Sequence, residues 1–302
     1  AASDVVLGGT VAGRHVTVRA GRDAVVSADV TGSLGSILIT AGDDLSIADG
    51  AAVNAGAQDV RLDAGDQLTV TGVTGGDVAL SSATGQILDG GDTLADVTAQ
   101  GLRVLAGTGA VLVGTGEAGA LEGTFATLAA TGGTVRVSAA GALAIGPVNV
   151  TIFEVLASGA VTALADVASP AGVLSSGALV ASAGTDLTVQ AGAEARATGA
   201  GNVRLAAGNN LVITGVAASG SGALELTAAG ALTLAGAAQT GGAGTVLATA
   251  GGALTLGANG LVTTAGGDVV LTAGGDLAVT GVDAGAGDVA LIAGGLIVDA
   301  GN

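Results

Sequence analysis

The sequence predicts an all-β protein built as a parallel β-helix, a solenoid of about 13 coils of roughly 22 residues each. Three observations support this prediction. A unit with the sequence DVVLTAGGDLAVTG runs from Asp268 to Gly281 and recurs at 59–72 and 202–215. Its apolar residues alternate with other residues, which is typical of a strand with one buried face. The apolar residues are almost all Ala, Val, Leu and Ile, which suits a thin, repetitive interior.

Each copy of the unit is expected to contain two short strands. In the copy at 59–72 the inward residues of the first strand are Val60 and Leu62, and those of the second are Leu68 and Val70. Such short strands cannot bury a face alone, so successive coils must stack in register. A helix is excluded because the apolar spacing is two and because each of the 57 Gly would cost a helix about 1 kcal/mol relative to Ala.

The link between the two strands is Ala-Gly followed by two small or polar residues. It occupies positions 64–67, 207–210 and 273–276. Gly, Asn and Asp at these positions tolerate positive φ and bond their own backbone, so we expect the link to be a tight corner. A second Gly-rich corner follows at Thr71 and Gly72.

The first inward apolar residue marks the start of each copy, and most starts are 18 to 24 residues apart. A worn copy near Val155 is placed inside the longer gap that follows Val135. The expected starts are Val16, Ile37, Val60, Val78, Leu102, Val135, Leu179, Val203, Leu224, Val246, Val269 and Val289.

The regular pattern breaks over residues 113–170, which hold both Phe residues, Phe125 and Phe153, and both Pro. We expect irregular coils or an insertion there, with Phe filling a wider interior; a ligand groove is the alternative. No linker divides the remaining sequence. The chain is therefore predicted to be a single β-helical repeat domain over 1–302, and to be a fragment of a longer shaft, because both ends lack amphipathic capping elements.

Charge and composition exclude several functions. The 25 acids against 8 basic residues give a net charge of -17, which repels nucleic acids and anionic lipids. No apolar run approaches the roughly 20 residues of a membrane span, so neither nucleic-acid binding nor membrane insertion is expected. The absence of Cys permits secretion without requiring it.

Few residues offer chemistry. His15 is the only His, and it precedes the first clear copy in an outward position, so neither a zinc site nor a serine nucleophile with a His base is supported. Asp43, Asp66 and Asp89 are each 23 positions apart, which predicts that they approach one another at successive corners. Calcium is the natural counter-ion for such carboxylates, although the sequence favours no metal, no cofactor and no catalytic residue.

Arginine side chains occupy outward positions beside the inward residues of the first strands. Because they are spread over many coils, a solvated face is favoured over a patch that binds sulfated glycans or phosphate. Carboxylates in the N-terminal third leave a carbohydrate-active β-helix enzyme as an alternative, but the absence of Trp and Tyr disfavours a sugar groove. The five outward arginines of the first strands are Arg19, Arg61, Arg103, Arg136 and Arg204.

The core AGxxLxV, seen as AGDDLSI at 41–47, AGDQLTV at 64–70, AGNNLVI at 207–213 and AGGDLAV at 273–279, resembles the haemagglutinin-type repeats of filamentous haemagglutinin-like exoproteins. AGRDAVV at 20–26 is similar to them too. The resemblance implies a right-handed β-helix and export through a partner pore in the outer membrane (two-partner secretion). The secretion domain of that family, with its NPNG or NPNL signatures, does not occur in this sequence.

The resemblance implies a secreted or cell-surface adhesin shaft, a rigid rod that supports attachment to host cells and contributes to virulence. A host surface protein or glycan is then the expected partner. A purely structural filament, with end-to-end self-association, is the neighbouring alternative, and the carbohydrate-active enzyme is a third.

Overall fold

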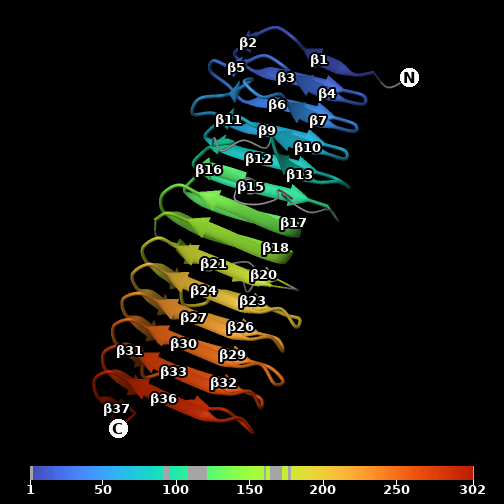
Figure 1. The fold of residues 1–302 in the computed structure, drawn as a ribbon. Coiled ribbons are helices and arrows are strands. Elements are labelled where there is room, and N and C mark those ends of the chain that lie inside the picture. Colours follow the sequence, from blue (N-terminus) through green and yellow to red (C-terminus); the bar gives the residue numbers. More distant parts are fainter. Residues whose placement is uncertain are drawn as a thin grey trace. The chain divides into compact units, whose positions relative to one another are not determined.

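A computed structural model describes residues 3–90, 95–107, 121–159, 161–163, 172–175 and 178–301. Over these residues the protein is all-β, and its parallel strands stack as a β-solenoid of about 12 turns of roughly 22 residues (Figure 1). The predicted fold class is confirmed. Contacts divide the chain into two compact units, Ala1–Gly141 and Ala142–Asn302. None of the described residues belongs to a helix that is long and apolar enough to cross a membrane.

Each coil carries strands on up to three faces, and the first face holds the longest regular strands. In the first unit these are β3 (Val16–Ala20), β6 (Ile37–Ala41), β9 (Val60–Ala64), β12 (Asp77–Ser82), β15 (Gly101–Ala106) and the beginning of β17 (Thr127–Ala139). In the second unit they are the end of β18 (Leu143–Ala157), β21 (Leu179–Ala183), β24 (Val203–Ala207), β27 (Leu224–Ala228), β30 (Val246–Ala250), β33 (Val269–Ala273) and β36 (Val289–Ala293).

The second face is made of short strands, most of three residues. In the first unit they are β1 (Val5–Leu7), β4 (Ala24–Val26), β7 (Leu45–Ile47), β10 (Leu68–Val70) and β13 (Ile87–Asp89). In the second unit they are the beginning of β18, then β19 (Val161–Ala163), β22 (Leu187–Val189), β25 (Leu211–Ile213), β28 (Leu232–Leu234), β31 (Leu254–Leu256), β34 (Leu277–Val279) and β37 (Ile297–Asp299).

The third face closes each coil with strands of two to four residues. In the first unit they are β2 (Val11–Gly13), β5 (Val30–Gly32), β8 (Val53–Asn54), β11 (Val73–Thr74), β14 (Val97–Thr98), β16 (Leu121–Thr124) and the end of β17. In the second unit they are the middle of β18, then β20 (Gly172–Ser175), β23 (Glu194–Ala197), β26 (Val216–Ser219), β29 (Ala237–Thr240), β32 (Leu261–Thr264) and β35 (Val282–Asp283).

The core lies inside the coils and consists of columns of like residues. Val60, Leu62, Leu68 and Val70 are all buried, as the alternation predicts. On the second face Leu211, Leu232, Leu254 and Leu277 follow one another in register and are fully buried. Each coil therefore covers the apolar residues of its neighbours, and burial of this kind is the main stabilising contribution.

The corner glycines are required for a reason other than the predicted one. Gly65 and Gly208 do not adopt positive φ, so these corners do not use the left-handed conformation that Gly tolerates. Instead, a Cβ at Gly65 would collide with the carbonyl oxygen of Gly42 in the preceding coil, and one at Gly208 with the carbonyl oxygen of Gly184. Stacked backbones approach closely at this corner, and only Gly leaves room.

Two long strands change the predicted positions of the copies. Leu102 pairs with Leu128, so the copy that was expected to start at Val135 begins at Leu128 instead. Leu179 pairs with Phe153 in the same way, so the worn copy expected near Val155 begins at Phe153, two residues earlier. The pattern was misleading because β17 continues from the first face to the third, where Val137 pairs with Leu121, and alternation alone does not tell which face a strand occupies.

The irregular region expected over 113–170 lies partly outside the described residues, which omit 108–120, 160 and 164–171. In its described part β18 runs through all three faces as one strand and pairs in turn with β19, β20 and β21. Phe125 and Phe153 are buried, with exposed fractions of 2% and 0%. The expectation that these two side chains fill the interior is confirmed.

Candidate functional site

The acids at one corner of the first unit accept hydrogen bonds from the coil that follows them. The Asp23 N–H donates to Asp4 Oδ1 at 3.4 Å, and the Asp44 N–H donates to Asp23 Oδ1 at 3.3 Å. The Gln67 N–H continues the series by donating to Asp44 Oδ1 at 3.0 Å. Arg22 also bonds Asp4 and holds the pKa of that carboxyl below its usual value.

The second unit builds its corner in the same way with Asp and Asn. Asn210 donates its N–H to Asp186 Oδ1 at 2.9 Å, and Asn210 Oδ1 in turn accepts the N–H of Ala231 at 2.9 Å. At these positions a side-chain oxygen satisfies a backbone donor of the next coil. We therefore assign these corner residues a structural role.

The three acids predicted to form a calcium site do not all meet. Asp43 and Asp66 come together with Asp44, and one carboxylate oxygen of each lies within 4.8 Å of the others. Asp89 is elsewhere because Leu68 pairs with Ile87, so the coil at this position advances by 19 residues and not by 23. The three acids of this corner are exposed, as expected for solvated carboxylates.

Asp89 belongs instead to a second group of acids, which sequence reasoning missed. One carboxylate oxygen each of Asp89, Asp96 and Glu122 lies within 4.8 Å of the others, and Asp96 is fully buried. Asp96 Oδ2 accepts the N–H of Glu122 at 3.1 Å. Each of the three acids makes a further polar or electrostatic interaction. Oxygen ligands of this kind suit Ca²⁺, but the hydrogen bond gives Asp96 the same structural role as the other corner acids.

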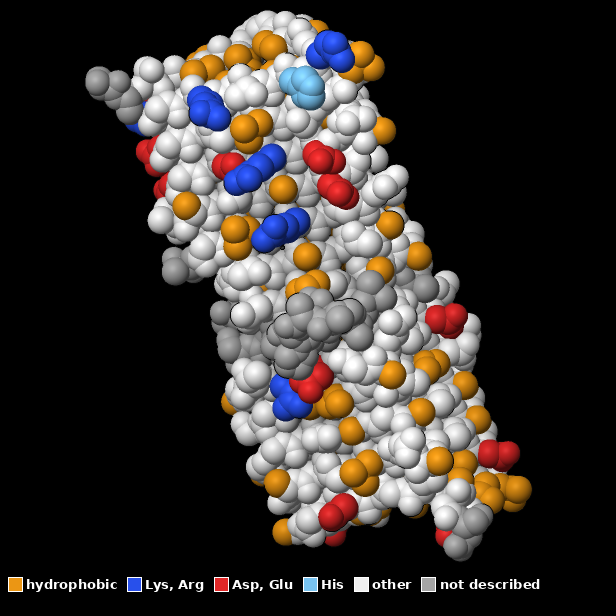
Figure 2. Space-filling model, turned by 180° about the vertical axis from the view of Figure 1, so that it is seen from behind, with side chains coloured by type: hydrophobic (Ala, Val, Ile, Leu, Met, Phe, Trp, Pro, Cys, Tyr) orange, Lys and Arg blue, Asp and Glu red, His pale blue; other side chains and the backbone are white. Residues whose placement is uncertain are grey.

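The outward arginines lie where the alternation predicts. Arg19, Arg61, Arg103 and Arg204 are exposed and Arg136 is half-buried. His15 is also exposed. Figure 2 shows one side of the molecule, on which basic and acidic side chains are scattered among hydrophobic and other residues.

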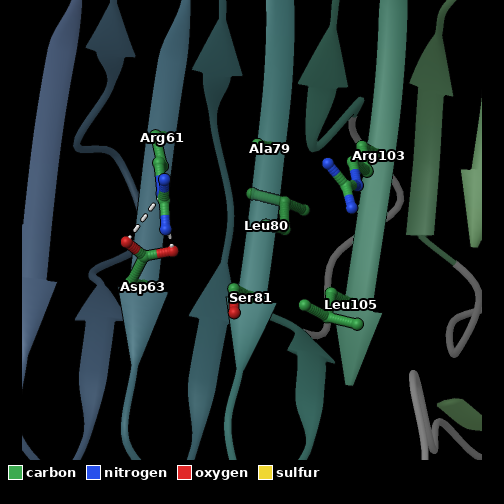
Figure 3. A pocket seen from close by; sticks show the side chains of 7 residues that line it. All are labelled: Arg61, Asp63, Ala79, Leu80, Ser81, Arg103 and Leu105. Atoms are coloured by element: carbon green, nitrogen blue, oxygen red, sulfur yellow. Dashed lines mark hydrogen bonds and ion pairs between the residues drawn. The ribbon is translucent and has the colours of Figure 1, made fainter. Parts of the chain in front are cut away.

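Arg61 and Arg103 are nevertheless brought to the same place, a shallow depression on the first face (Figure 3). Both pair in register with Ala79, Arg61 from β9 and Arg103 from β15. The residues two positions further along these strands form the other half of the depression. Its lining consists of Arg61 and Asp63 on β9, Ala79, Leu80 and Ser81 on β12, and Arg103 and Leu105 on β15.

The two arginines of the depression differ in their partners. Arg61 Nε donates to Asp63 Oδ2 at 2.8 Å. Arg103 has no ion pair or hydrogen bond to any side chain of the described chain, and Figure 3 shows its guanidinium group turned toward β12. Sequence reasoning missed this grouping because the two arginines are 42 positions apart and only the register places them beside one small residue.

The arrangement of these groups can bind an anion. Two guanidinium groups, a carboxylate and the Ser81 hydroxyl line an open surface, which can hold an anionic group by charge and hydrogen bonds. Comparison with protein-family models, with curated proteins and with solved structures finds no match to this chain. A proposal for its function therefore depends on the repeat sequence and on the geometry of the solenoid.

Proposed function

We propose that the chain is a shaft segment of a secreted or surface-displayed adhesin, a stiff spacer that holds a binding region away from the cell. The observation that carries this proposal is the continuity of the ladder within each unit. In the second unit the first-face strands pair in unbroken register from Phe153 through Leu179, Val203, Leu224, Val246 and Val269 to Val289.

The mechanics follow from this register. Within each unit the described coils are joined to their neighbours by backbone hydrogen bonds on up to three faces, and further bonds tie the corners together. Bending a unit would stretch many of these bonds at once, whereas an isolated strand pair has few. The resemblance of the AGxxLxV repeats to those of filamentous haemagglutinin-like exoproteins supports the same proposal, with an outer-membrane secretion partner and a host protein or glycan as the ligand of the binding region.

A deletion that respects the register tests this function. Leu224 pairs with Val246, so removing residues 224–245 takes out one coil and lets Val246 occupy the place of Leu224. A spacer should remain folded and be displayed on intact cells with attachment retained, because no single coil is essential. Circular dichroism, antibody labelling of intact cells and a cell-attachment assay measure these three properties.

The matched control removes half a coil, residues 224–234, and should prevent correct stacking because it places the third-face strand β29 where a first-face strand belongs. If the whole-coil deletion folds but abolishes attachment, the coil itself carries the activity and the spacer function is wrong. A carbohydrate-active enzyme would instead release reducing or unsaturated sugars from acidic polysaccharides. A filament would show end-to-end growth in light scattering as concentration rises.

A further inference from the structure

We propose that the depression between Arg61 and Arg103 binds the carboxylate of a uronic acid residue in an acidic saccharide. This inference goes beyond the spacer function, because a shaft without the site would stack and project in the same way. Two residues from each of three adjacent strands, at matched positions, face outward around a shallow floor.

The spacing suits one small anionic group. Ala79 separates the two arginines in register, and strands lie about 4.8 Å apart, so the Arg backbones are roughly 10 Å apart. The Ala79 methyl group leaves the space between the two longer side chains open. A carboxylate placed above Ala79 lies within reach of both guanidinium groups, each of which can donate two parallel hydrogen bonds.

The charge of the depression favours a single negative charge. Arg61 and Arg103 are positive and Asp63 is negative, which leaves one net positive charge. Arg61 is committed to Asp63 by the 2.8 Å ion pair, whereas no described residue pairs with Arg103. A carboxylate neutralises the remaining charge, while a doubly charged phosphate would carry more negative charge than the depression can balance.

The other groups of the lining suit a sugar ring around that carboxylate. Asp63 can accept hydrogen bonds from ring hydroxyls, and the Ser81 hydroxyl can both donate and accept. Leu105 is 41% exposed and offers an apolar surface for the C–H groups of a pyranose. A free amino acid or small acid would leave these groups unused, which is why we commit to a uronic acid.

Outward arginines of the second unit provide a contrast within the same fold. Arg204 lies 3.7 Å from Glu225 on the next strand, and Arg196 lies 2.9 Å from Glu194. Their charges are matched by a neighbouring carboxylate, so they offer no net charge to a ligand. Arg204 is therefore the control for the loss of an exposed Arg from the first face.

The test is a titration of the full chain with trigalacturonate, in which isothermal calorimetry or NMR measures the binding. Because hydrogen bonds to charged groups are worth about 1.5–3 kcal/mol, Arg103→Ala and Arg61→Ala should each weaken binding about tenfold or more, whereas Arg204→Ala should leave it unchanged. Melting curves confirm that the variants are folded. Neutral trigalactose should not bind.

Three outcomes would overturn the proposal: no binding of trigalacturonate, equal weakening by Arg204→Ala, or equal binding of a sulfated saccharide without uronic acid. The last result would show attraction by charge alone. Added salt should weaken specific binding only in part, because the hydrogen bonds persist when the Debye length shortens to about 8 Å at 0.15 M. None of these results alters the deletion experiment, so the two proposals can fail separately.

Discussion

Within each unit, the regular coils and the long strand form the same kind of ladder with different corners. In the regular coil 203–213, Gly208 allows the backbones to approach and Asn210 bonds the next coil. In β18 the chain passes through all three faces as one strand, and the large side chain of Phe153 occupies the interior. Stacking in register therefore does not depend on one kind of corner. The corners set the local fit, while the ladder and the core hold the coils together.

The largest effect is expected in the core. Phe153→Ala removes a fully buried aromatic ring and should lower the free energy of unfolding by about 3–5 kcal/mol. Leu226→Ala, at a buried position of a regular coil, should cost about 2–5 kcal/mol. Chemical denaturation of both variants measures the difference. A cost below about 1 kcal/mol for Phe153→Ala would show that the long strand does not need its aromatic filling.

The next effect comes from the corner glycines. Gly208→Ala brings a methyl group against the carbonyl oxygen of Gly184, and the shift of backbone that follows should cost about 1–3 kcal/mol. Gly266→Ala is the control, because its methyl group would meet no atom closer than 3.8 Å. Equal melting temperatures for the two variants would contradict the close approach of stacked backbones.

A smaller effect is expected from the corner hydrogen bonds. Asn210→Ala removes the acceptor for the N–H of Ala231 and should cost about 1 kcal/mol. Asn210→Asp keeps an acceptor oxygen and should cost less. Denaturation in parallel measures both variants, and a larger loss for Asp than for Ala would mean that charge repulsion, not the hydrogen bond, dominates this corner.

The smallest effect concerns pH. The hydrogen bond from Arg22 lowers the pKa of Asp4 below the usual 3.8. A lowered pKa in the folded state means that the stabilisation is present above pH 3.8 and is lost as pH falls through the folded pKa. Both side chains are exposed, so solvent screens the pair. Asp4→Asn should slightly reduce the melting temperature near neutral pH and leave it unchanged in strong acid; the same difference at both pH values would contradict this account.

The fold was predictable because its local signals repeat. Eleven of the twelve expected starts lie on first-face strands at the predicted position, as Val60 and Val203 show. The prediction was wrong at Val135. The strand there continues past the first face, and the alternation of apolar residues does not tell which face a residue occupies. The right-handed sense of the coil remains a prediction.

The candidate site was less predictable because it depends on register. Asp66 and Asp89 are one typical repeat apart, yet the intervening coil is short and they do not meet. In the sequence, Arg61 and Arg103 look like isolated surface charges. The structure brings them together because both pair in register with Ala79. Small changes in coil length decide which side chains of neighbouring coils meet. No sequence motif marks these changes in length, because packing at the corners sets them.

Disulfide cross-linking tests most directly the central claim that one register runs through both kinds of coil. The chain has no Cys, so introduced pairs react without competition. Arg204 pairs with Glu225 in the regular coils and Glu154 pairs with Val180 on β18, and neighbouring strands lie about 4.8 Å apart, within the Cα separation that a disulfide needs.

The double variants Arg204→Cys with Glu225→Cys and Glu154→Cys with Val180→Cys should both form disulfides readily under mild oxidation. The offset pair Leu156→Cys with Val180→Cys, shifted by two positions along the same strand, should react much more slowly. Mass spectrometry after digestion measures each yield. If the offset pair reacts faster than Glu154→Cys with Val180→Cys, the long strand does not share the register of the regular coils and the account is contradicted.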